Sequence, residues 1–164
     1  MMTVAQAKRL FSLVRAARAY NYEVPSGRQL AELLYPGKTV GWAQIRAANA
    51  VVQRLGKYGC IRKKGTVRRI DEARLVTERS SAQFVLLFRD LCLAAPDLTI
   101  TRETLEAQAR SHLPEDVDLE VLFARAVEGR YITPIAAQPG HLRIGGHLND
   151  QLPYLSLFLE DATQ

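Results

Sequence analysis

The sequence predicts a mainly helical fold with small β-hairpins, of the α+β class. Three observations favour this class: apolar residues recur at steps of three and four over several segments, Gly- and Pro-containing turns separate those segments, and two pairs of short strand-like runs flank turns. Apolar residues make up 48% of the 164 residues and charged residues 24%, which is typical of globular proteins. A chain of this length buries enough surface to form a core without disulfides or a metal.

The first half of the chain has one clear order of expected elements. These are a helix over 4–20, an extended segment over 22–25, helices over 29–34 and about 40–55, and a hairpin made of the runs 58–62 and 66–70. Ser26 and Gln29 have the spacing of a capping box before the second helix. Thr39 is the expected N-cap of the third helix, and Gly56 is expected to end it.

The second half repeats this order. Its expected elements are a helix over about 82–94, an extended segment over 98–100, a helix capped by Thr101, a helix over about 117–128, and a hairpin made of the runs 131–135 and 141–144. Gly56-Lys57-Tyr58 and Gly129-Arg130-Tyr131 share a Gly–basic–Tyr pattern 73 residues apart, and Leu30 and Leu105 lie 75 apart. Identity is otherwise low, so the repeat lies in the order of elements, and chance agreement is the alternative.

Charge divides the chain more sharply than its overall net charge of +5 indicates. Residues 1–79 contain 16 Lys and Arg against 5 Asp and Glu, a net charge of +11, whereas residues 80–164 contain 6 against 12, a net charge of −6. The polar stretch 77–81 marks the expected boundary between a basic unit, 1–79, and an acidic unit, 80–164. Opposite charges predict different partners for the two units, with a polyanion for the first.

The order helix, short strand, helix, helix, hairpin resembles that of winged helix-turn-helix DNA-binding proteins, twice over, from about residue 4 to 147. The resemblance is one of fold and involves no signature motif. It implies two winged-helix units in tandem. It also implies that the third helix enters the major groove of DNA and that the hairpin touches the backbone or the minor groove.

Side chains on the third helix of the first unit are suited to reading bases. Trp42, Arg46, Asn49 and Gln53 recur at steps of four, three and four, beside an apolar stripe of Ile45, Ala48, Val52 and Leu55. Arg, Asn and Gln carry planar groups that match base edges in the major groove, so these four are the expected base-contacting residues. The alternatives are a solvated polar face and, for Trp42, a place in the core.

Basic residues near this helix in the sequence are suited to binding the phosphates of DNA. The first hairpin holds five of them and no acid, namely Arg62, Lys63, Lys64, Arg68 and Arg69. Lys38 and Thr39, just before the third helix, join them as expected phosphate contacts. Cations of this kind neutralise phosphates without regard to sequence. The alternative is a solubilising strand edge that blocks sheet pairing.

The second unit has different side chains at the matching places. Its third helix begins with four carboxylates, Glu115, Asp116, Asp118 and Glu120, and its second turn has no cation. This predicts a unit kept for packing, dimerisation or a protein partner. Tyr154, Leu155 and Phe158, in an apolar closing helix or strand, are the expected partner or dimer interface, and burial against their own domain is the alternative.

Several classes of protein and site are not expected. No apolar run approaches the roughly 20 residues of a membrane span, so no membrane partner is expected. The three His lack metal-site spacing, the place of the first Gly of a phosphate-binding loop before Gly37-Lys38-Thr39 is Glu32, and no nucleophile motif stands out. We therefore expect no enzyme activity, cofactor or metal. Two Cys without a CxxC spacing indicate a reduced, cytoplasmic protein, nucleoid-associated if bacterial.

Together these features predict a duplex DNA-binding protein, either sequence-specific or site-selective. Its expected role is transcription regulation or an accessory role in replication or recombination, with a homodimer or a protein partner through 80–164. One alternative is a protein-interaction subunit, similar to the tandem winged-helix accessory subunits of chromosome-condensing complexes. A second is an RNA-binding module, although no aromatic platform for unpaired bases is evident.

Overall fold

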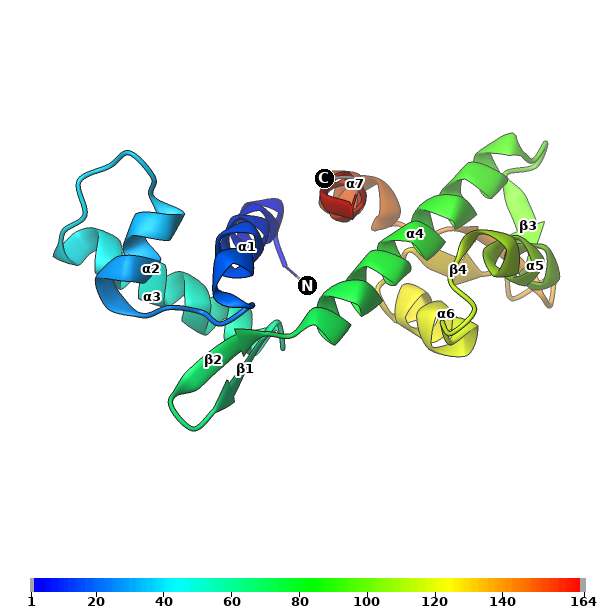
Figure 1. Ribbon diagram of the computed structural model, residues 1–164. Coiled ribbons are helices and arrows are strands. Elements are labelled where there is room, and N and C mark those ends of the chain that lie inside the picture. Colours follow the sequence, from blue (N-terminus) through cyan, green and yellow to red (C-terminus); the bar gives the residue numbers. More distant parts are fainter. Residues whose placement is uncertain (1, 163–164) are drawn as a thin grey trace. The chain divides into compact units, whose positions relative to one another are not determined.

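The computed structural model describes residues 2–162 and has an α+β architecture of helices with two small antiparallel sheets (Figure 1). The predicted fold class, mainly helical with small hairpins, is confirmed. The chain divides into two compact units, Met1–Val76 and Thr77–Gln164.

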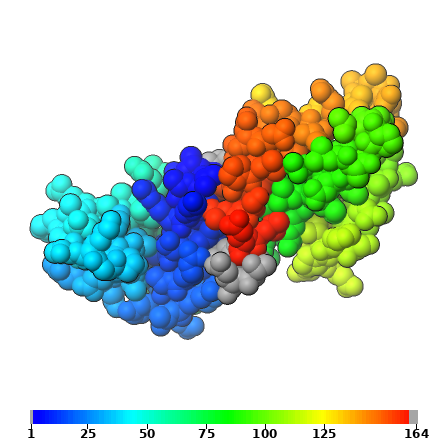
Figure 2. All heavy atoms as spheres, turned by 90° about the horizontal axis from the view of Figure 1, so that it is seen from above, coloured from blue at the N-terminus to red at the C-terminus, as the bar shows by residue number. Residues whose placement is uncertain are grey.

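The first unit consists of three helices and a hairpin. Its elements are α1 (Val4–Ala17), a short 3-10 helix (Arg18–Tyr20), α2 (Gly27–Leu34), α3 (Trp42–Lys57), β1 (Ile61–Lys64) and β2 (Val67–Ile70). Fully buried Leu10, Leu13, Leu30 and Leu55 join α1, α2 and α3 in one core. Part of α2 and of the loop after it is visible at the surface of this unit, in light blue to cyan in Figure 2.

An extended segment adds a third line of pairing to the first hairpin. The Val24 N–H donates to the Arg68 carbonyl at 2.8 Å, and the Ile70 N–H donates to the Tyr22 carbonyl at 3.0 Å. Glu23 is thereby paired antiparallel with Arg69 of β2. The segment that precedes α2 is therefore fixed to the hairpin that follows α3.

The second unit has the same order of elements and one further helix. It contains most of α4 (Glu72–Ala94), followed by β3 (Thr99–Thr101), α5 (Arg102–His112), α6 (Leu119–Glu128), β4 (Ile132–Pro134), β5 (His141–Ile144) and α7 (Leu148–Ala162). Its three strands lie in the order β3-β5-β4, so the strand before α5 pairs with the second strand of the hairpin, as in the first unit. Thr101 caps α5 as predicted, accepting from the Thr104 N–H at 3.2 Å.

Matching hydrogen bonds close the third helix in both units. The Cys60 N–H donates to the Leu55 carbonyl at the end of α3, and the Tyr131 N–H donates to the Ala126 carbonyl at the end of α6. The residue before each donor, Gly59 or Arg130, has a positive φ, of 74° and 60°. These are Schellman-type ends, in which a left-handed residue lets the chain reverse into the hairpin.

These bonds show that equivalent residues of the two helix ends lie 71 apart in the sequence. The shared pattern of Gly56-Lys57-Tyr58 and Gly129-Arg130-Tyr131 implied a separation of 73, so that alignment is wrong by two residues. The cause is that the left-handed position is occupied by a glycine in one unit and by an arginine in the other. The alignment of Leu30 with Leu105 agrees with the structure in that both are fully buried at equivalent places in α2 and α5.

Helix α4 begins ten residues before the expected start at 82. The Asp71 side chain accepts from the Arg74 N–H at 3.2 Å and provides an N-cap that the sequence analysis missed. The polar stretch 77–81 therefore lies inside a helix, with Ser80 buried, and is not a linker.

Two smaller corrections concern the expected helix caps. Ser26 precedes α2, but its side chain makes no cap hydrogen bond, and the Gln29 side chain donates to the Tyr20 hydroxyl at 2.7 Å. Thr39 lies too early to cap α3, which Gly41 precedes.

The base of the second hairpin requires a glycine at 145. A Cβ at this buried position would lie 2.1 Å from the Arg130 carbonyl oxygen, whereas a Cβ at Gly146 would have no atom within 4 Å. We expect Gly145→Ala to lower the free energy of unfolding by about 1–3 kcal/mol through overpacking against backbone, and Gly146→Ala to change it little. Urea denaturation followed by far-UV circular dichroism measures both, and equal losses would contradict this account.

Candidate nucleic-acid interface

The long stretch from Leu33 to Ile70 contains nine Lys and Arg and no Asp or Glu. It covers the loop before α3, the whole of α3, and the hairpin formed by β1 and β2. We call this stretch the basic segment. Its length, 38 residues, exceeds that of the hairpin on which the sequence analysis based the phosphate site.

Helix α3 has one buried side and one exposed side. Ala48, Val51, Val52 and Leu55 are buried, and Ile45, which was expected in the apolar stripe, is half-buried. Because 3.6 residues make one turn, the side opposite this stripe holds positions 42, 46, 50, 53 and 57. This exposed side presents two cations, two small alanines nearby and no carboxylate.

The predicted base-contacting residues do not lie equally far from the core. Trp42 is 77% exposed, so its alternative placement in the core is wrong. Arg46 and Gln53 are exposed on the same side of α3, but Asn49 is half-buried and lies toward its edge. Lys57, four residues after Gln53, extends this exposed row and was missed, although its i+4 spacing was a sufficient signal.

The hairpin presents different cations on its two faces. Lys63 pairs with Arg68 and Ile61 with Ile70, while Arg62 pairs with Arg69 and Lys64 with Val67. Since side chains alternate along a strand, Lys63 and Arg68 share a face with Ile61 and the buried Ile70. The opposite face, which we call the outer face, holds Arg62, Lys64, Val67 and Arg69.

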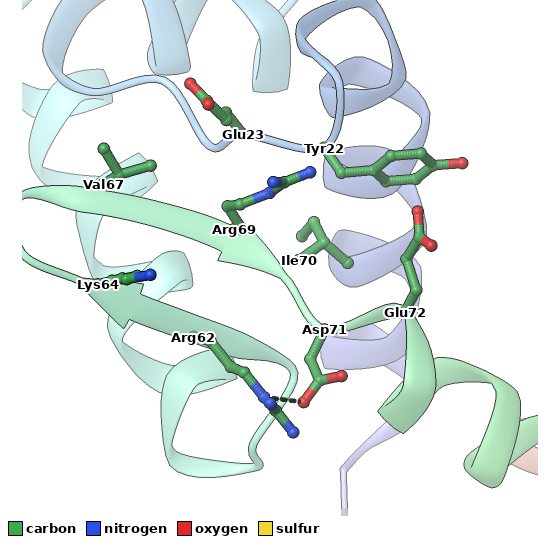
Figure 3. A pocket seen from close by; sticks show the side chains of 9 residues that line it. All are labelled: Tyr22, Glu23, Arg62, Lys64, Val67, Arg69, Ile70, Asp71 and Glu72. Atoms are coloured by element: carbon green, nitrogen blue, oxygen red, sulfur yellow. Dashed lines mark hydrogen bonds and ion pairs between the residues drawn. The ribbon is translucent and has the colours of Figure 1, made fainter.

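Two cations of the outer face already have partners, and Figure 3 draws the pair formed by Arg62 and Asp71. Arg62 forms an ion pair through its Nε with Asp71 Oδ2, and Arg69 donates to the Asn21 carbonyl at 2.8 Å. This face lines a shallow concavity bordered by Tyr22, Glu23, Arg62, Lys64, Val67, Arg69, Ile70, Asp71 and Glu72. Its three carboxylates offset its three cations, so the outer face near the helix start is poorly suited to phosphate.

The remaining hairpin cations are available. Within the part of the chain that the structure describes, the side chains of Lys63, Lys64 and Arg68 make no hydrogen bond or ion pair. Lys63 and Arg68 border a groove between the hairpin and the start of α2, which Glu23, Ser26 and Gln29 also line. The five expected phosphate contacts of the hairpin thus divide into three available cations and two that bind the protein itself.

Lys38 and Thr39 lie exposed in the loop before α3. Two hydrogen bonds hold the end of this loop: Arg28 donates to the Val40 carbonyl at 3.0 Å, and the Gly41 N–H donates to Gln44 Oε1 at 2.9 Å. The start of α3 is therefore fixed to α2 just before Trp42.

The second unit has acidic or neutral residues where the first unit has its exposed row. With the offset of 71 residues, the equivalents of Asn49, Gln53 and Lys57 are Glu120, Ala124 and Glu128. The equivalents of Trp42 and Arg46 fall at 113 and 117, before α6 begins at Leu119 rather than at the expected 117. The second unit therefore keeps the order of elements without the cations.

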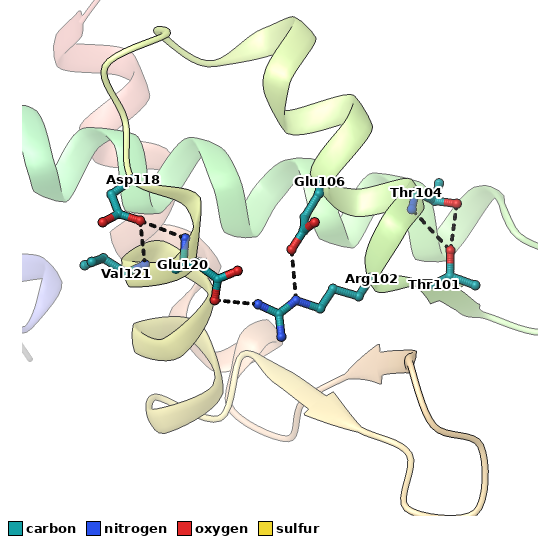
Figure 4. Close-up of polar contacts among 7 residues, drawn as sticks. All are labelled: Thr101, Arg102, Thr104, Glu106, Asp118, Glu120 and Val121. Atoms are coloured by element: carbon teal, nitrogen blue, oxygen red, sulfur yellow. Dashed lines mark hydrogen bonds and ion pairs between the residues drawn. The ribbon is translucent and has the colours of Figure 1, made fainter.

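Several charged groups of the second unit bind one another. Arg102 donates to Glu106 at 2.9 Å and to Glu120 at 2.7 Å (Figure 4), and its guanidinium also lies 4.0 Å from the centroid of the Phe123 ring. Arg125 pairs with Glu78 at 2.7 Å. Burial, with the Glu78 charge adding to it, raises the pKa of Tyr131 to about 12.

The side chains expected at a partner or dimer interface are buried in a single copy of the chain. Tyr154, Leu155 and Phe158 are 5%, 3% and 1% exposed, within the helix α7. Tyr154 donates to Glu78 Oε2 at 3.5 Å and packs edge-on against Phe158. This burial favours the alternative in which the apolar tail packs against its own chain.

No group of three or more His, Cys, Asp or Glu in the described residues has the arrangement of a metal site. None of the helices in residues 2–162 has the length and apolar character needed to cross a membrane. No family model, curated protein or solved structure matches this chain. The proposals below therefore depend on the chain's own residues.

Asp71 links the hairpin to α4 through two interactions, the N-cap hydrogen bond from the Arg74 N–H and the ion pair with Arg62. Different substitutions remove them separately. Asp71→Ala removes the N-cap and is expected to lower the free energy of unfolding by about 1 kcal/mol. Asp71→Asn keeps a capping oxygen, and Arg62→Ala removes only an exposed partner, so each is expected to cost under about 0.5 kcal/mol. Urea denaturation of the three variants measures this. A loss for Asp71→Asn as large as that for Asp71→Ala would show that the ion pair dominates.

Proposed function

We propose that the first unit is a winged-helix module that binds duplex DNA. In this proposal α3 lies in the major groove, and Arg46 and Gln53 contact base edges, with Asn49 at the side of the contact. Lys38, Thr39, Lys63, Lys64 and Arg68 contact phosphates. Arg62 and Arg69 have a smaller part, because their guanidinium groups already bind Asp71 and the Asn21 carbonyl.

The basic segment carries this proposal. Without a single carboxylate, it places eight cations on the third helix and the hairpin, which are the two elements that contact DNA in winged-helix proteins, and a ninth, Lys38, in the loop before the helix. A solubilising role would be met by mixed charge, as on the outer face near Glu23 and Asp71. Three hairpin cations whose side chains have no partner in the described residues are suited to an external polyanion.

The second unit has a supporting role in this proposal. Its equivalent of the exposed row is acidic and would be repelled by phosphate. Tandem units of which only one is basic fit a regulator of transcription, or an accessory factor of replication or recombination, whose second unit forms a dimer or holds a protein. The protein itself has no catalytic role here.

Loss of hairpin cations tests the phosphate contacts. Lys63→Ala/Lys64→Ala is expected to weaken binding to every duplex alike and to reduce the slope of log K against log salt by about 2, because each released counterion contributes about 0.9. The measurement is fluorescence anisotropy of a labelled random duplex between about 50 and 200 mM salt.

The matched control is Arg110→Ala/Arg143→Ala, which removes the same charge from exposed positions of the second unit. It should leave the salt slope unchanged. Equal effects of the two double variants would mean that only net charge matters, and no binding by the parent protein at low salt would overturn the proposal.

Loss of Arg46 tests base reading. After a preferred site has been selected from random duplexes, Arg46→Ala is expected to lose about 1–3 kcal/mol on that site and to relax the preference at one base pair. Arg54→Ala, on the same helix and also exposed but about 80° around the axis, is the control and should weaken all duplexes slightly and equally. If both variants lose the same affinity on selected and random duplexes, α3 does not read bases.

A further inference from the structure

The first residue of α3 presents an indole ring to solvent. Trp42 is 77% exposed, well above the other large apolar side chains that are exposed in the described residues, which range from 39% to 54%. Its neighbour Ala43 and the alanine at 47 are small and exposed, so they do not cover it. Neither packing nor a hydrogen bond within residues 2–162 accounts for a tryptophan at this position.

The ring is presented from a fixed position. It begins a helix of 16 residues whose opposite side is buried, and the hydrogen bonds from Arg28 to the Val40 carbonyl and from the Gly41 N–H to Gln44 hold the chain just before it. A partner that covers the indole therefore meets a preformed surface. Such preorganisation lowers the entropic cost of binding.

The charge around the indole indicates the chemistry of that partner. Lys38 and Arg46 lie four residues before and after Trp42, and the nearest carboxylates along the chain are Glu32 and Asp71. A flat aromatic face between cations is the arrangement in which nucleic-acid bases stack while their phosphates are neutralised. In an intact duplex the faces of the bases are covered by their neighbours, so only an unstacked or unpaired base offers its face.

We propose that Trp42 stacks on an unpaired or unstacked base next to the duplex held by α3 and the hairpin. The preferred substrate is then duplex DNA that contains a bulge, a junction or a single-stranded end, in place of an uninterrupted duplex. This inference rests on the proposed function, because the duplex contacts of Arg46 and of the hairpin lysines place the indole beside the DNA.

The chain contains one tryptophan, so its intrinsic fluorescence reports on Trp42 alone. The protein is titrated with a duplex, with the same duplex carrying one unpaired base, and with the same duplex carrying a single-stranded tail. Anisotropy of a label on the DNA measures binding independently. We expect stronger quenching of Trp42 and about 10-fold tighter binding for the two interrupted duplexes, as base stacking on an aromatic ring provides.

Two variants separate stacking from a general loss of affinity. Trp42→Ala is expected to bind all three DNAs with the affinity that the parent protein has for the plain duplex, and Trp42→Phe is expected to keep most of the preference. Binding seen by anisotropy without a change in Trp42 fluorescence, or with equal affinity for all three DNAs, would overturn this inference and leave the proposed function standing. No binding by anisotropy to any of the DNAs would overturn both.

Discussion

The backbone of Cys60 holds together the two elements on which the proposed DNA contact depends. Its N–H donates to the Leu55 carbonyl at the end of α3, and its carbonyl accepts from the Asp71 N–H at 2.8 Å, at the end of β2. The side chain is fully buried, so neither bond competes with water. The direction of α3 and the base of the hairpin are thus fixed by one residue, and the cations that each carries keep a constant spacing. A binding surface made of two elements needs such a junction, because each element alone would present its cations to phosphates at variable distances.

The second unit has the same junction with a different side chain. The Tyr131 backbone makes the two equivalent bonds, to the Ala126 carbonyl and from the Gly145 N–H, and here a tyrosine ring fills the buried position. The order of elements and the strand pairing are likewise shared. What differs is the exposed side of the third helix, where Glu120 and Glu128 stand in place of Asn49 and Lys57. Two units with the same order of elements thus have third helices of opposite charge. The fold alone therefore says little about the partner of either unit.

Sequence patterns predicted the order of elements well because it depends on local features. The 3.6-residue period of α1, α3 and α4, the Thr101 cap and the two hairpins follow from side chains close together in the chain. The failures have long-range causes. The stretch 77–81 is polar enough for a linker, yet it continues α4 because Asp71 caps the helix earlier and because Glu78 meets Arg125, 47 residues away. Similarly, Arg62 and Arg69 have the composition of phosphate contacts, but Asp71 and Asn21 bind them in the folded chain.

The residues of the candidate interface also divide into those that local sequence spacing could place and those that depend on contacts distant in the chain. The period of α3 was sufficient to place Trp42, Arg46 and Gln53 in one row. It left the core as an alternative for Trp42, because an apolar residue at the start of an amphipathic helix packs inward or outward according to the loop before it. That loop is held at Val40 by Arg28, a contact between residues 12 apart. The start of α3 is therefore set by α2, the indole is left outside the core, and its presence there is a property of the folded unit. An exposed ring that the fold holds in place, with one cation four residues before it and another four residues after it, is more consistent with a role in binding than with incomplete packing.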